Sequence, residues 1–359
     1  MEYYVKDKLD QTEHENILNF LSSLDFYCIE QHPDWDSEYQ GVLKKFFFCT
    51  DENQAVKCYA NIIVSKNGPL KLAYINFGPA FADYEVLTRT VQFLHGYFSK
   101  EGYIYFTIQL GIYISEKTEL LEYTINKDFK VKYYFKPGNL WSSLCVDLTR
   151  SETDIFESFS KGHRKNIRAG YKKDLTMAIH QDNSGFDDFI ALYIRMLEFR
   201  NLPYNKQALI YEFNNIFEII NKYKKGFIGY IFEKEILVGT LIIIFQGNSA
   251  RYIKSASDPE RRDLEITYLG LNEAIKYCKE NGFQRLDLWG YNHFVDEKDQ
   301  VFYINKFKKG FTDNFTFFPK RMHFELKPNV YKVFLSLKFF KNGISNILLK
   351  RNISKAKNQ

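Results

Sequence analysis

Regularly spaced basic side chains follow a capping-box-like start at Ser151 to Asp154. Between residues 161 and 172 they recur every three or four positions, which places them on one face of a predicted helix: Lys161, Arg164, Lys165, Arg168 and Lys172. Such a stripe, with Arg164 and Arg168 as its forked donors, can bind an RNA backbone or the phosphates of a nucleotide- or lipid-linked substrate. A solvated helix face gives the same pattern, so both interpretations stay open.

Asp287 and a lysine run are the other residues that could do chemistry. Asp287 lies between Leu286 and Leu288, so strand alternation points it away from those leucines. It could position an amine or take its proton, and it could equally be a buried carboxylate that caps a loop. Lys306, Lys308 and Lys309 read on their own as a solvated charge run.

The chain shows no pattern for nucleophilic or metal-dependent catalysis. His163 and His293 are isolated and lack ligand spacing, so we interpret both as ordinary polar residues. The five cysteines are odd in number and form no Cys-x-x-Cys pair, which argues against a disulfide framework and a structural zinc site. We expect no Ser/His/Asp or Cys/His arrangement.

The second half of the chain predicts a β-meander followed by a helix and a returning strand. The strands are expected at 227–232, 236–246 and 250–256, the helix at 263–281 before Gly282, and the last strand at 283–288. This order is that of the GNAT acyltransferase fold. We therefore expect an α/β (α+β) protein with a mixed, mainly antiparallel sheet flanked by helices.

The first half repeats this order. Strands are expected at 56–65 and 71–77, a helix from about Tyr84 to Glu101, and a strand at 103–109. Pro79 and Gly102 are 23 residues apart, as are Pro259 and Gly282. The repeat predicts two tandem GNAT-like domains.

Domain boundaries follow from the repeat. We expect a first domain over 1–145, with the segment near 315–330 as a candidate to complete it, a second domain over 146–320, and a C-terminal strand, helix and basic tail over 321–359. No signal peptide or stretch of 18 apolar residues is visible, and the thiols favour a reducing setting, so we expect a cytoplasmic protein.

The C-terminal tail has a charge pattern of its own. From Lys327 onward no acidic residue occurs, and eight basic ones do: Lys327, Lys332, Lys338, Lys341, Lys350, Arg351, Lys355 and Lys357. A basic helix with an apolar stripe can lie on anionic lipid at the inner face of the membrane, or bind RNA. A docked helix with a solvated end is the alternative.

Four stretches together resemble the FemABX family of peptidoglycan-bridge enzymes, over most of the chain. They are Gln31 to Trp35, Tyr74 to Pro79, the strand 144–148 with the basic segment 164–169, and Asp287 to Gly290 with Phe307 to Phe311. The resemblance implies transfer of an amino acid from aminoacyl-tRNA to an amine of a peptidoglycan precursor, with no metal and no bound cofactor. In some relatives the donor is instead a thioester and the acceptor an amino sugar.

The resemblance also implies roles for individual residues. Lys308 matches the family's lysine in Phe-Lys…Gly-Phe, so it is the candidate for stabilising phosphate or a developing oxyanion. Asp287, in the family's Asp…Gly strand end, is the second catalytic candidate, and Lys309 is a candidate for substrate binding. Trp35 matches the tryptophan of the family's N-terminal glutamine-tryptophan segment and is a candidate for substrate binding. Tyr39 stands where relatives often carry a lysine, and of the family's Arg…Tyr pair only Tyr211 is kept.

Three functions remain open on this basis. The first is an aminoacyl-tRNA-dependent transferase of cell-envelope metabolism. The second is an N-acyltransferase that uses acyl-CoA or an acyl carrier to modify an amino sugar of a surface polysaccharide. The loop 257–263 counts against it, because it has no glycine and contains three acidic residues where a pyrophosphate would bind. The third is a non-catalytic double-GNAT protein that binds RNA or a partner.

Overall fold

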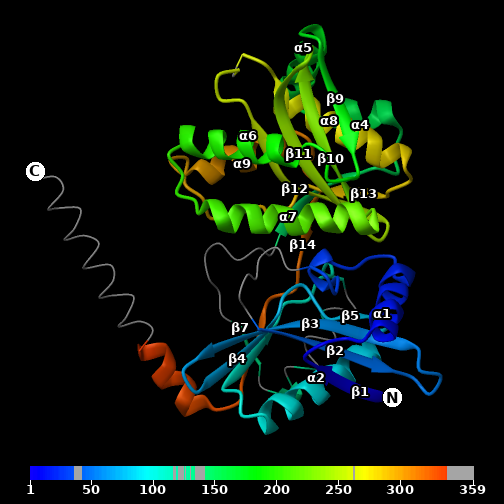
Figure 1. Ribbon diagram of the computed structural model, residues 1–359, viewed down its shortest axis with the longest axis vertical. Helices are drawn as coiled ribbons and strands as arrows, with labels where there is room; N and C mark the ends of the chain where they lie inside the picture. Colours follow the sequence, from blue (N-terminus) through cyan, green and yellow to red (C-terminus); the bar gives the residue numbers. More distant parts are fainter. Residues whose placement is uncertain are drawn as a thin grey trace, which may run out of the picture.

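Two halves, each built on one sheet, make up the computed structural model (Figure 1). It describes residues 1–35, 43–115, 119, 125, 127–129, 131–133, 142–261 and 263–337. Tyr39, Arg262 and the tail beyond residue 337 therefore lie outside the described residues. The expected α/β class with two tandem GNAT-like sheets is confirmed.

The first sheet has the order β1-β2-β3-β4-β6-β15-β7, with β5 paired to β3. Its strands and helices are β1 (Glu2–Lys6), α1 (Gln11–Ser23), η1 (Ile29–Gln31), β2 (Leu43–Thr50), β3 (Val56–Asn67), β4 (Leu70–Ile75), β5 (Ala80–Phe81), α2 (Tyr84–Lys100), β6 (Tyr105–Ile108), β7 (Lys132–Tyr133) and β15 (Met322–Glu325). Apolar side chains of α2 pack on β3, β4 and β6 to form its core. The chain thus returns to the first sheet at β15, after it has built the second.

The second sheet has the order β14-β8-β13-β12-β11-β10-β9. Its elements are β8 (Ser142–Asp147), α4 (Glu152–Ser158), α5 (Lys161–Lys172), β9 (Leu175–His180), α6 (Phe186–Phe199), α7 (Lys206–Tyr223), β10 (Gly226–Glu233), β11 (Ile236–Gln246), β12 (Ser249–Ser257), α8 (Ile266–Glu280), β13 (Arg285–Asp287), α9 (Gln300–Lys309) and β14 (Phe315–Phe317). All of β8 belongs to this sheet, so we propose that the boundary lies before Ser142 instead of at residue 145.

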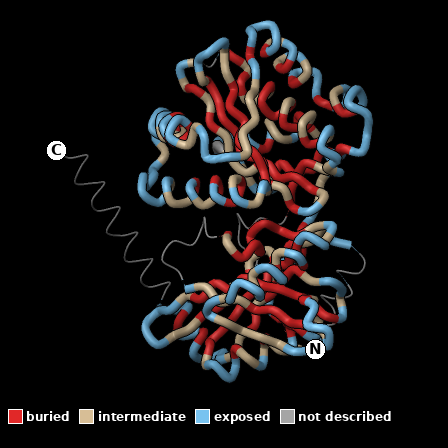
Figure 2. The backbone as a smooth tube through the Cα atoms, turned by 45° about the vertical axis from the view of Figure 1, so that its right-hand side comes forward, coloured by how far each residue is buried: buried red, intermediate tan, exposed pale blue. Residues whose placement is uncertain are grey.

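Strand alternation explains why both faces of the second sheet are covered. In β10, Phe227 faces the core formed with α8, whereas Ile228 and Tyr230 face the core formed with α6 and α7. Strands such as β10 and β11 are accordingly buried over most of their length (Figure 2). Ile29 and Trp35 of the first half join the second of these cores, which packs the two halves together.

The predicted repeat is present in both sheets. β3, β4, α2 and β6 in the first half correspond to β11, β12, α8 and β13 in the second, and β4–β6 and β12–β13 are the parallel pairs. Gly102 and Gly282, which follow the two helices, have φ values of +80° and +79°, a conformation that favours glycine. α8 begins at Ile266, three residues later than the pattern predicts, because Leu264 and Arg261 lie in a preceding turn.

Candidate active site

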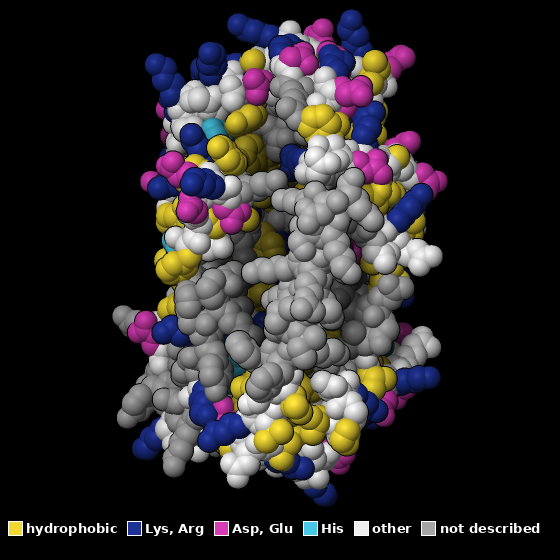
Figure 3. All heavy atoms as spheres, turned by 90° about the vertical axis from the view of Figure 1, so that its left-hand side faces the viewer, with side chains coloured by type: hydrophobic (Ala, Val, Ile, Leu, Met, Phe, Trp, Pro, Cys, Tyr) yellow, Lys and Arg dark blue, Asp and Glu magenta, His cyan; other side chains and the backbone are white. Residues whose placement is uncertain are grey.

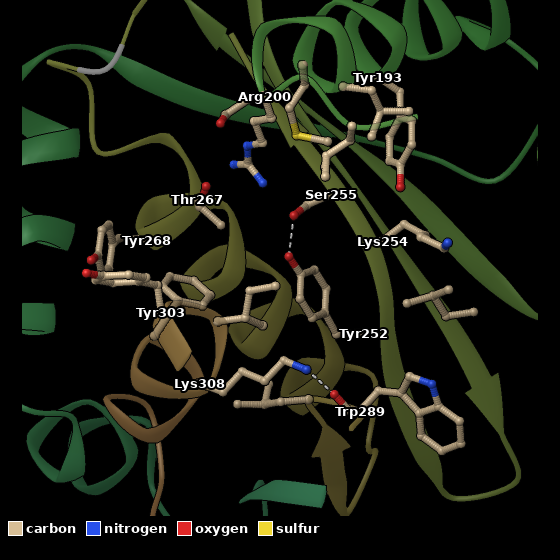
Figure 4. A pocket seen from close by; sticks show the side chains of 18 of the residues that line it. Tyr193, Arg200, Tyr252, Lys254, Ser255, Thr267, Tyr268, Trp289, Tyr303 and Lys308 are labelled. Carbon is tan, nitrogen blue, oxygen red and sulfur yellow. Dashed lines mark hydrogen bonds between the residues drawn. The ribbon is translucent and has the colours of Figure 1, made fainter. Parts of the chain in front are cut away.

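A cavity of about 790 Å³ opens where β12 and β13 separate. The two strands pair only from Ser249 to Arg251 with Arg285 to Asp287, and beyond these residues they diverge. The ends of α6, α8 and α9 complete the walls (Figure 4). The lining is rich in aromatic side chains: Tyr193, Phe199, Tyr252, Tyr268, Trp289, Tyr303 and Phe307. The described lining includes Arg200, Lys254 and Lys308 as cations and no carboxylate.

Lys308 is half-buried at the base of this cavity. Its ammonium donates to the carbonyl oxygens of Trp289 and, at 2.9 Å, of Gly290 (Figure 4). Burial lowers the pKa of Lys308 from its ordinary 10.5 to about 8, while the negative charge of Asp287 acts in the opposite direction. Near neutral pH the side chain is therefore mostly a cation, and one of its three donor hydrogens is left for a ligand.

Asp287 stabilises the loop whose carbonyl oxygens accept hydrogen bonds from Lys308. Its Oδ1 accepts from the Trp289 backbone N–H at 2.7 Å and from the hydroxyl of Ser143, and its Oδ2 accepts from the Tyr113 hydroxyl at 3.1 Å. The side chain is 2% exposed and does not line the cavity. These contacts favour the interpretation of Asp287 as a buried cap that positions Trp289, which has a φ of +53°, over a role in taking a proton.

Arg251 fixes the indole of Trp289 from the other side. Its guanidinium carbon lies 3.5 Å from the centre of the ring, and the side chain is 2% exposed. Its Nη1 donates to Glu30 Oε1 at 2.8 Å. Glu30 and Tyr113 belong to the first half of the chain. Glu30 contacts Arg251, and Tyr113 contacts Asp287. The first half therefore supports Trp289, whose carbonyl accepts from Lys308, through two separate sets of contacts.

His163 supports the helix that carries Lys308. Its Nε2 is 2.8 Å from the carbonyl oxygen of Phe307, and a carbonyl can only accept, so the proton lies on Nε2. Burial lowers the pKa of His163, which keeps the ring neutral. A Cβ atom on Gly310 would come within 2.0 Å of the ring, so only glycine fits where α9 ends. His163 thus has a packing role that its isolated position in the sequence does not suggest.

Arg200 brings a second cation to the cavity. Its guanidinium points between Thr267 and Ser255 (Figure 4), and within the described part of the chain it has no hydrogen-bonded or ion-paired acceptor. Lys254, in contrast, pairs with Glu212 at 3.1 Å. The first turn of α8 faces the adjoining 300 Å³ space and has no side-chain cap. Together these groups offer donors to a phosphate or carboxylate.

Arg261, from the loop before α8, also lines that space, but its guanidinium is already paired. Arg261 forms a salt bridge with Glu233, with its Nη2 at 2.6 Å from Oε1, and Asp258 pairs with Arg195 at 2.5 Å. The charged groups of Arg261 and Asp258 are therefore engaged by partners within the protein. The observation agrees with the expectation that this loop is not a typical pyrophosphate-binding loop.

The other candidate substrate-binding residues that the structure describes do not line the cavity. Trp35 is 3% exposed and packs in the core against α7, so its place in the core explains why a tryptophan stands at this position. Arg164 donates to the carbonyl oxygens of Glu157 and Phe159, which cap the end of α4, and Arg168 lies 5.3 Å over the ring of Phe156.

Tyr211 and Lys309 also lie away from the lining. Tyr211 is half-buried on α7 and Lys309 is exposed at the end of α9. Tyr39 is outside the described residues. Of the predicted residues, Lys308 alone lines the cavity among those that the structure describes, and Asp287 supports it from behind.

Two further observations concern metals and membranes. Among the described residues, no group of three or more His, Cys, Asp or Glu side chains could hold a metal ion. No helix in the described ranges is long and apolar enough to cross a bilayer.

Comparison with known proteins gives a family match for part of the chain and a shared fold for most of it. Residues 201–338 match the FemAB family. This range begins directly after Arg200 and includes β12 and Lys308. A solved structure of FemX is similar over 93% of this chain and 99% of its own, with 16% sequence identity and a TM-score of 0.77.

Two other solved structures share the fold. L-PGS from Bacillus licheniformis matches 89% of this chain and 93% of its own, with 13% identity and a TM-score of 0.57. A tandem GNAT protein from the clavulanic acid biosynthesis pathway matches 90% and 99%, with 10% identity and a TM-score of 0.51. No curated protein matches significantly. The family match thus covers the part of the chain that carries Lys308, and the fold of the chain is similar to that of FemX.

Proposed function

We propose that the protein transfers an aminoacyl group from aminoacyl-tRNA to an amine of a peptidoglycan or other cell-envelope precursor. The observation that carries this proposal is the half-buried ammonium of Lys308, held by two backbone carbonyls at the base of an aromatic cavity. The family match over 201–338 supports a transferase, because it covers most of the cavity lining, Lys308 included.

The geometry suits attack by an amine on an activated ester. The acceptor nitrogen attacks the ester carbonyl, the carbon–oxygen bond to the ribose breaks, and the amine proton passes to the departing oxygen or to water. The free hydrogen of the Lys308 ammonium is available to the carbonyl oxygen as negative charge develops on it. The ester is already activated, so alignment and one buried cation are the main requirements, and the cavity offers both.

Arg200 and the uncapped first turn of α8 suit the phosphates near the end of the donor. Both line the space that joins the main cavity. A coenzyme A thioester also carries phosphates, so an N-acyltransferase acting on an amino sugar of a surface polysaccharide is the second candidate. The inward pairing of Arg261 with Glu233 favours the tRNA donor over it.

The experiment is a radiolabel transfer assay with mixed charged tRNAs and, separately, with labelled acetyl-CoA, each against a pool of envelope precursors. Lys308→Met should abolish transfer, whereas Lys306→Met, which changes an exposed lysine of the same helix, should not. Label that moves only from the thioester would refute the tRNA donor. Equal activity in Lys308→Met and wild type would refute the assigned site, and the absence of transfer from either donor would favour a non-catalytic binding protein.

A further inference from the structure

The helix at 328–337 is fixed to the first half by one of its faces. Tyr331 and Phe334 pack against Leu72, Ile104 and Tyr105, and the rings of Tyr331 and Tyr105 lie 4.6 Å apart. The backbone N–H groups of residues 326 and 327 both donate to the Ile104 carbonyl. The start of this helix therefore has a defined position on the molecule.

A second face of the same helix is apolar and faces solvent. Val330, Val333 and Leu337 are 40%, 59% and 62% exposed. Spacings of three and four residues align them along one stripe, next to the face that is packed. Single exposed apolar residues are common, but an aligned stripe of three on one helical segment indicates a surface that another phase or molecule covers.

The charge around the stripe indicates what covers it. Lys327 and Lys332 are exposed on this segment, and the last acidic residue before the end of the given sequence is Glu325. Six further basic residues follow in 338–359. On the face shown in Figure 3, hydrophobic side chains gather beside Lys and Arg side chains at the lower end of the molecule. Apolar contact together with one sign of charge is complementary to an anionic lipid surface.

We propose that the stripe of Val330, Val333 and Leu337, with the exposed Lys327 and Lys332 on the same segment, docks the protein on the surface of an anionic bilayer. The apolar side chains would enter the boundary between headgroups and acyl chains, and the lysines would remain at the phosphates. RNA would bind the basic side chains but not the apolar stripe. A second copy of the protein would bring like positive charges together and be repelled. The proposal does not depend on the proposed function, because binding is measured without turnover.

Co-sedimentation of the full chain with vesicles tests this proposal. We expect binding to phosphatidylglycerol-containing vesicles that weakens with salt, and at least about tenfold weaker binding to phosphatidylcholine vesicles. The triple variant Val330→Ser, Val333→Ser, Leu337→Ser should lose about tenfold in affinity for the anionic vesicles. Ile236→Ser is the matched control, because it removes an apolar side chain that is 61% exposed on a different surface.

The triple variant should fold normally, since all three side chains face solvent, and its thermal unfolding midpoint verifies this. Equal vesicle binding by the folded triple variant and wild type would overturn the proposal. Equal binding to both kinds of vesicle, or an RNA affinity that the same substitutions weaken without any vesicle binding, would also overturn it.

Discussion

Replacing Lys308 with methionine should change how the stability of the protein depends on pH. In the folded protein the pKa of Lys308 is about 8, and in the unfolded chain it returns to about 10.5. Between these values the unfolded state binds more protons, so the free energy of unfolding of the wild type should rise with pH. The full difference corresponds to about 3 kcal/mol at about 1.4 kcal/mol per pH unit.

Methionine is the useful substitution because it keeps most of the side-chain volume and cannot titrate. It also leaves the carbonyls of Trp289 and Gly290 without their donor, at a cost of about 1–3 kcal/mol, so the two effects oppose each other at pH 7. The change with pH is free of this offset. From pH 7 to pH 10, the wild type should gain about 2.5 kcal/mol relative to Lys308→Met.

Urea denaturation of both proteins at several pH values measures this difference. Other titrating groups contribute equally to both proteins and cancel in the comparison. Lys306→Met, at an exposed position of α9, should follow the wild type. Parallel pH profiles for Lys308→Met and wild type would refute the burial of this ammonium and, with it, the assignment of Lys308 as a cation poised near neutral pH.

Three other substitutions test the groups around the site. Gly310→Ala should lower the free energy of unfolding by about 1–3 kcal/mol, because its Cβ would meet the ring of His163, and the cost should shrink in a His163→Ala background; additive costs would contradict this contact. Glu30→Gln should cost about 3–5 kcal/mol by leaving Arg251 unpaired, and the double variant with Arg251→Met should cost less than the sum; chemical denaturation measures both. Arg200→Gln should raise KM for the donor about tenfold with little change in kcat, and an unchanged KM would exclude a phosphate contact.

The sequence predicted the elements whose evidence is local. The strand 236–246 and the start of the helix at Tyr84 agree with β11 and α2, because alternation, helical spacing and glycine ends are properties of neighbouring residues. Because the element order repeats, the prediction for each half supported the prediction for the other. β15 lies in the segment near 315–330 that was expected as a candidate to complete the first domain, but nothing near it indicates β6, more than 200 residues earlier, as its partner.

The site was harder to predict, because its contacts are distant along the chain. Strand alternation places Arg251 in β12 between Ala250 and Tyr252, but nothing nearby indicates that Glu30, 221 residues away, pairs with it. Arg200 follows α6 without any motif. Lys308 was predicted from the family resemblance. The local sequence alone does not distinguish it from the other two lysines of the same run. Trp35 illustrates the opposite case, since its motif is present while its side chain is used in the core.

The return of the chain to the first sheet has a consequence for biosynthesis. β6 pairs with β4 on one edge, and its other edge receives β15, which ends at Glu325. While the ribosome makes the second half, the edge of β6 has unpaired backbone groups that could pair with another nascent chain. The amino-terminal sheet therefore cannot be completed in the order of synthesis, because its strand β15 is made only after the whole second sheet.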